Sequence, residues 1–243
     1  MNARQLTRLA SEIGQAASLV VGAHFLGAVW TGLAWSALVA LRLWQASDRQ
    51  SILSRLGIEL ILGLSLVILV MLNRLWPTEI LLGAVYLAWR LSGDRPDNLK
   101  LRLWRLGTAF FVALAAIFTA TAIWRWPALV VVALAWLVSW LVARELLAPG
   151  ERGAAALAAA WALIVAEIAY LFAIWLVSYI LPGGSLIVPQ AAIVLVALGY
   201  CFMSIYIAHI NAKLSRSRLA EYVIIGLCLL IIVMAGTKWN GAI

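Results

Sequence analysis

Charged residues are scarce in this chain of 243 residues: they make up 12% of the sequence, whereas hydrophobic residues make up 65%. Soluble domains carry about 25% charged residues, so the composition excludes an ordinary soluble fold. The mean hydropathy of +1.03 supports the same conclusion. Because each transmembrane helix needs about 20 apolar residues, the length leaves no room for a sizeable soluble domain. The sequence therefore predicts an all-α polytopic membrane helix bundle.

The motifs of the common site chemistries are also missing. The sequence has no HExxH, no P-loop GxxxxGK[ST] and no GxSxG pattern. Its two cysteines, Cys201 and Cys228, lie in apolar segments, without the spacing of a paired-cysteine metal motif. We therefore expect no catalytic residues, no metal site and no enzymatic activity.

The formal net charge of +8 arises from basic residues that lie between the apolar runs. Nucleic-acid binding needs basic residues on one water-facing patch, so we expect membrane lipids as partners and no nucleic acid. The most charged connection, residues 93–107, contains Arg95, Lys100, Arg102 and Arg105. We expect this loop either to anchor in lipid headgroups or to dock a cytoplasmic partner.

The apolar runs predict eight transmembrane helices. A short amphipathic helix over residues 1–16 is expected to precede them and to lie in the membrane interface. Residues 17–243 then form a single transmembrane helical domain. Proline and glycine residues between the runs support the divisions. The predicted helices cover about residues 17–43, 57–75, 78–91, 106–124, 128–142, 154–181, 188–210 and 220–234.

The distribution of basic residues predicts an orientation. With eight spans, thirteen of the eighteen Lys and Arg residues fall in alternate connections, and the termini and remaining loops share the other five. Basic loops remain on the cytoplasmic side. We therefore expect both termini on the non-cytoplasmic side of a prokaryotic plasma membrane.

Glu167 is the strongest candidate functional residue in the sequence. It lies near the centre of the predicted helix 154–181, a segment that contains no Lys or Arg. Helical spacing places it on one face with Ala156, Ala160 and Tyr170, so we expect it to face protein. Ionisable groups at membrane depth are costly and usually functional. Glu167 is interpreted either as a proton-coupling or cation site, with Tyr170 and His24 as neighbours, or as a neutral carboxyl that fixes helix packing.

The two histidines, His24 and His209, are predicted at different membrane depths, so they cannot bind one haem iron together. Each is a candidate for a single ligand to a haem or pigment, because imidazole is a common metal ligand. The alternative for each is a hydrogen bond to a neighbouring helix. The sequence identifies no particular cofactor.

These observations favour a non-enzymatic accessory or scaffold subunit of a larger membrane complex, able to hold lipid or pigment between its helices. Its expected partners are other membrane proteins or further copies of the chain. The second hypothesis is a proton-coupled secondary transporter that uses Glu167. A lipid-modifying membrane enzyme is the third.

Overall fold

The computed structural model describes residues 3–45, 49–73, 75–92, 99–147, 153–175, 178–180, 187–210 and 215–236. Within these ranges the chain forms nine helices and one two-stranded hairpin. In chain order they are α1 (Ala3–Phe25), α2 (Ala28–Gln45), α3 (Arg49–Asn73), α4 (Trp76–Leu91), α5 (Leu99–Trp124), α6 (Ala128–Leu146), α7 (Ala154–Ile174), β1 (Ser178–Ile180), β2 (Ile187–Pro189), α8 (Gln190–Ile210) and α9 (Arg216–Gly236).

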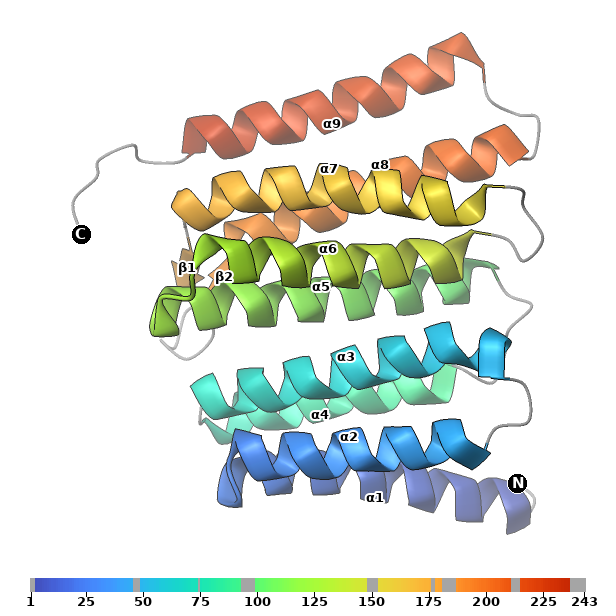
Figure 1. Ribbon diagram of the computed structural model, residues 1–243, viewed down its shortest axis with the longest axis vertical. Helices are drawn as coiled ribbons and strands as arrows, with labels where there is room; N and C mark the ends of the chain where they lie inside the picture. Colours follow the sequence, from blue (N-terminus) through green and yellow to red (C-terminus); the bar gives the residue numbers. More distant parts are fainter. Residues whose placement is uncertain are drawn as a thin grey trace.

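The helices lie side by side in two layers, and consecutive helices run in opposite directions (Figure 1). Helices α2, α3, α6 and α7 form the nearer layer, and α1, α4, α5 and α8 form the layer behind it. Helix α9 packs against α8 at one edge. We call the end of the bundle at which α1 begins the proximal end and the other end the distal end. Helix α9 finishes at the distal end.

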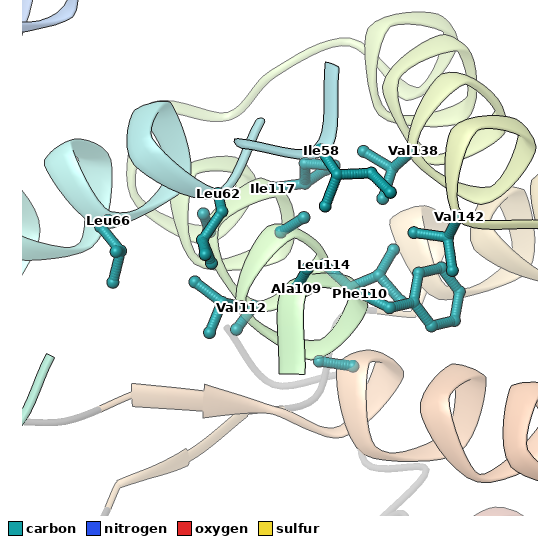
Figure 2. Packing of buried hydrophobic residues seen from close by; sticks show 14 of the residues in the cluster. Ile58, Leu62, Leu66, Ala109, Phe110, Val112, Leu114, Ile117, Val138 and Val142 are labelled. Carbon is teal, nitrogen blue, oxygen red and sulfur yellow. The ribbon is translucent and has the colours of Figure 1, made fainter. Parts of the chain in front are cut away.

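Helix α5 is the centre of the apolar core. Every residue from Val112 to Thr121 is buried, because α5 contacts α3, α6 and α8. Leu62 of α3 and Val138 of α6 point toward α5 from their own helices (Figure 2). In lipid, close van der Waals packing holds helices together. The buried helix α5 therefore connects helices α1–α4 with helices α6–α9.

Five helices in the described ranges, α3, α5, α6, α7 and α8, are long and apolar enough to cross a membrane. Shorter apolar stretches occupy residues 28–42 of α2 and 219–228 of α9. The all-α class is therefore confirmed, and the apolar helices are compatible with an integral membrane protein.

The N-terminal region differs from the sequence prediction. Helix α1 continues without a break from Ala3 to Phe25, and the expected single helix over residues 17–43 is divided by a tight turn. Gly27 makes this turn with a φ of +82°, a backbone conformation that costs glycine little. Glu12, on the polar face of α1, is buried against α4. Residues 3–45 therefore form a helical hairpin inside the bundle.

The predicted helix over residues 154–181 is also too long. Helix α7 ends at Ile174, and Ser178–Ile180 pairs antiparallel with Ile187–Pro189. Strand pairing satisfies backbone groups that the helix would otherwise have bonded. Glu167 consequently lies about 20 Å from the start of α7 and about 10 Å from its end, at 1.5 Å per residue.

Gly63 supplies a test of the α2–α3 packing. A Cβ atom at Gly63 would lie 2.0 Å from Nε1 of Trp35, which is a rigid ring. We expect Gly63→Ala to lower the free energy of unfolding by about 1–3 kcal/mol, the usual cost of overpacking. Thermal unfolding in one detergent measures the effect. Gly107→Ala is the matched control, because its added Cβ meets nothing within 4 Å. Equal unfolding temperatures for the two variants would contradict this packing.

Candidate functional site

Five polar side chains from α1–α4 form a buried cluster in the proximal half of the bundle. We call them the proximal cluster: Glu12, Gln15, Arg42, Glu59 and Arg90. The two carboxylates and Arg90 are nearly buried, with side-chain exposures of 9–15%, and Arg42 is 28% exposed. Two arginines balance two glutamates, so the cluster has no formal net charge.

Arg90 lies at the centre of the proximal cluster. Its Nε and Nη2 atoms donate to the two carboxylate oxygens of Glu12 at 2.6 and 3.1 Å. Its Nη1 lies 2.7 Å from Oε1 of Glu59, so one guanidinium joins α1, α3 and α4. Arg42 adds α2 by pairing with the same Glu59 oxygen, and Gln15 accepts a 3.0 Å hydrogen bond from Arg42. Paired in this way, buried charges avoid the full cost of desolvation.

Aromatic rings extend the proximal cluster toward the middle of the bundle. Tyr86 stacks on Trp89, and Trp35 meets Tyr86 edge to face with ring centroids 5.8 Å apart. The guanidinium of Arg105 lies 4.5 Å above the Trp89 ring, and the Trp89 indole donates to the Arg105 carbonyl oxygen. Among the described residues, the Tyr86 hydroxyl and the Trp35 indole nitrogen have no hydrogen-bond partner. These two buried groups could therefore each form one further hydrogen bond.

A second buried pair occupies the distal half, where His24 of α1 meets Glu79 of α4. His24 Nδ1 and Glu79 Oε1 are 2.8 Å apart, and Glu79 is fully buried. The ring of Trp76 lies 4.9 Å from the histidine ring. Glu79 lies in the first turn of α4, and its carboxyl pairs with His24 across the helix interface. Helices α1 and α4 are thus joined by polar contacts at both ends.

The structure does not bring His24 to Glu167. His24 lies on α1, and Glu167 lies on α7 near the other end of the row of helices (Figure 1). Glu167 and Tyr170 are exposed, in contrast to the expectation that they face protein. The buried face of α7 is formed instead by small residues such as Ala162 and Ala169, which pack inward.

Glu167 lies in an open groove of about 530 Å³ between α6 and α7. Apart from Tyr170, the other lining residues are apolar: Leu129, Val132, Leu163, Ala166 and Leu171. Within the described part of the chain, Glu167 has no hydrogen-bond or ion-pair partner. The surrounding apolar surface would face lipid in an isolated chain.

The remaining predicted residues lie apart from these groups. His209 is exposed in the last turn of α8, and Lys100 is exposed in the first turn of α5. Arg102 donates to the carbonyl oxygen of Glu145 on α6, so it contributes to helix packing. Arg95 lies outside the described residues.

Two apolar cavities lie beside α8 and share the stacked rings of Trp161 and Phe202. One, of about 90 Å³, lies among α5, α6, α7 and α8. The other, of about 300 Å³, lies among α7, α8 and α9. Their lining is suited to hydrocarbon chains rather than polar substrates.

Sequence reasoning missed the proximal cluster. Among the described side chains, Arg42 of α2 and Arg90 of α4 contact Glu59, and the sequence predicts neither pair. The available signal was the position of both arginines inside the last turns of apolar helices, with Glu12 on the polar face of α1. Long basic side chains at helix ends usually reach the headgroups, so this signal is weak.

Comparisons of this chain with protein-family models, curated proteins and solved structures found no match. Function must therefore be inferred from the chain's own residues.

The ion pair between Glu12 and Arg90 supplies a test of the proximal cluster. Arg90→Met and Glu12→Leu each leave an unbalanced buried charge, so each should lower the free energy of unfolding by about 3–5 kcal/mol. The double variant keeps the neutral Arg42–Glu59 pair and should lose clearly less than the sum. Unfolding of all three variants in one detergent measures the coupling.

Lys100→Met is the control for the loss of one charge, because Lys100 is exposed, and it should change stability little. Strict additivity of the two single variants would mean that Glu12 and Arg90 do not interact.

Proposed function

We propose that the protein is a non-enzymatic subunit of a larger membrane complex that binds its protein partner through the exposed face of α7. The observation that carries this proposal is the position of Glu167. A carboxyl group about 10 Å from the end of a membrane-crossing helix, surrounded by apolar side chains, is costly when it faces lipid. A partner helix that covers α7 would supply both packing and a hydrogen bond.

The buried charges favour a structural role for the interior. In the described residues of α1–α4, Arg42, Arg90 and His24 each contact a carboxylate. Such a set stabilises one arrangement of four helices. By contrast, a transporter is expected to direct polar groups into a cavity near the midplane.

The alternative, proton-coupled transport through Glu167, has less support. Tyr170 is the only other polar residue in the lining of its groove, and His24 lies on a distant helix. The two apolar cavities beside α8 support lipid binding between helices as an additional property of the subunit.

We further propose that all nine helices cross a prokaryotic plasma membrane, with the proximal end in the cytoplasm. Dividing the region 17–43 into two helices changes the number of spans from eight to nine. An odd number of spans places the termini on opposite sides, and the N-terminus moves to the cytoplasmic side. Fifteen of the eighteen Lys and Arg residues then lie on the cytoplasmic side, against thirteen with eight spans, so the positive-inside rule is better satisfied. The three on the other side are Arg74, Arg125 and Lys238.

Reporter fusions test this topology. We expect a reporter before Met1 to be cytoplasmic and a reporter after Ile243 to be on the opposite side, because nine spans place the termini on different sides. Paired enzymatic reporters that are active on only one side of the membrane measure both positions. Two termini on the same side would contradict nine spans.

Purification in mild detergent tests the subunit role. We expect the chain to elute with a stoichiometric protein partner, which can be another copy, and we expect Ala160→Trp to release it. A tryptophan on the exposed face of α7 prevents a partner helix from packing closely, but its apolar ring is compatible with surrounding lipid. Leu33→Trp is the matched control on the exposed face of α2, where Leu33 is 59% exposed. A lone monomer both in mild detergent and in lipid nanodiscs would contradict the proposal.

A further inference from the structure

The larger of the two apolar cavities beside α8 is a groove with α8 as its floor and α7 and α9 as its walls. We call it the α8 groove, and its volume is about 300 Å³. Leu198 and Cys201 of α8 belong to the floor, and Ile168 of α7 and Gly226 of α9 belong to the walls. The Cys201 thiol and the Tyr222 hydroxyl are its polar groups, so the groove is suited to a hydrocarbon chain.

The depth of the α8 groove matches one lipid leaflet. Its lining starts at Ile205, about 8 Å from the proximal end of α8, and reaches Leu195, about 22 Å from that end, at 1.5 Å per residue. Half of a hydrocarbon core is about 15 Å thick, and the headgroup layer adds about 6 Å outside it. In a bundle that crosses the membrane, the groove therefore coincides with the hydrocarbon of the proximal leaflet.

The volume of the α8 groove suits one acyl chain. A methylene group is about as large as a water molecule, whose share of liquid volume is about 30 Å³. A groove of about 300 Å³ thus holds about ten methylene groups, which is the size of one chain within a leaflet. An α-helix with its side chains is about 10 Å wide and would need about 1,200 Å³ over the same length. The groove therefore fits a lipid chain better than a helix of another protein.

The chain is basic where the α8 groove approaches the headgroup layer. Residues 209–219, which join α8 to α9, contain His209, Lys213, Arg216 and Arg218 and no Asp or Glu. The structure describes the side chains of His209 and Arg216, and both are exposed at the proximal ends of their helices. Basic side chains beside a membrane surface attract anionic lipids. The charge of this connection is therefore complementary to a negatively charged headgroup.

We propose that the α8 groove binds a phospholipid of the proximal leaflet, with one acyl chain along α8 and an anionic headgroup at residues 209–219. This inference rests on the lipid binding in the proposed function, and it names the site and the class of lipid. It does not depend on the protein partner of α7. Tyr222, about 9 Å from the proximal end of α9, can offer its hydroxyl to the ester groups between headgroup and chain.

Mass spectrometry of the intact protein released from lipid nanodiscs tests the site. In nanodiscs of equal parts phosphatidylglycerol and phosphatidylcholine, we expect each chain to retain a single phosphatidylglycerol. Gly226→Leu should abolish this retention by filling the groove, because a Cβ atom at Gly226 meets only the flexible Leu198 side chain, at 3.8 Å. Gly107→Leu is the matched control, because Gly107 lines the smaller cavity instead, and it should retain the lipid.

A second variant covers the case in which Gly226→Leu does not fold. Val223 lies on the α9 wall of the groove and is 47% exposed, so Val223→Trp blocks the groove without overpacking the core. It should also abolish retention. Unfolding temperatures equal to that of the unaltered protein show that each variant is folded.

Removing charges tests the headgroup preference. Glutamine in place of the three basic residues of the connection should lower the preference for phosphatidylglycerol by about tenfold or more, because each contributes severalfold. The changes are Lys213→Gln, Arg216→Gln and Arg218→Gln. The matched control removes three basic residues from the proximal part of α1 and α3 and should keep the preference. Its changes are Arg4→Gln, Arg8→Gln and Arg49→Gln.

Different failures have different meanings. Retention of phosphatidylglycerol by folded Gly226→Leu and Val223→Trp would overturn the site, because the lipid would then lie elsewhere. Equal retention of both lipids by the unaltered protein would overturn the anionic headgroup. Displacement of the lipid by inorganic phosphate would overturn the role of the acyl chain. In each case, a protein partner that still purifies with Gly226→Leu would leave the subunit role standing.

Discussion

The guanidinium of Arg90 is the group on which the packing of α1–α4 depends. It holds the carboxylates of Glu12 and Glu59 at hydrogen-bond distance, and these belong to helices that begin 46 residues apart in sequence. Within the proximal cluster, removing the guanidinium would leave two buried acids and one arginine, Arg42. Because a buried charge without a partner is strongly destabilising, the arrangement of α1, α3 and α4 depends on this one side chain.

Helices α6 and α7 are held together by close packing of small residues rather than by ion pairs. Helices α6 and α7 approach closely through Ala135, Ala158, Ala162 and Ala169, all fully buried. In lipid there is little hydrophobic gain from bringing helices together, so small residues and dense packing replace it. Helix α5 connects the two halves because its buried surface contacts α3 on one side and α6 and α8 on the other. The bundle thus combines buried ion pairs among α1–α4 with close apolar packing of α6 and α7.

This difference explains how much of the fold the sequence predicts. Helices α6 and α8 lie close to the predicted ranges because prolines separate long apolar runs there. The sequence predicts a single helix over residues 17–43 because Gly27 interrupts the apolar run without adding polarity. Their length was an available signal, since 27 residues span about 40 Å, more than a hydrocarbon core of about 30 Å. The contact between Glu12 and Arg90 joins residues 78 positions apart, and helical periodicity carries no information about such pairs.

The buried carboxyl groups of α1–α4 each have a basic partner, whereas Glu167 on α7 has none among the described residues. Glu12, Glu59 and Glu79 are nearly or fully buried, and each contacts an arginine or a histidine of a neighbouring helix. Glu167 is exposed, and the lining of its groove offers no basic residue. A chain that supplies a partner for each deep carboxyl within α1–α4 shows how costly an unpartnered acid would be in lipid. No such partner meets Glu167 among the described residues, which is why the proposed function places its partner on another protein.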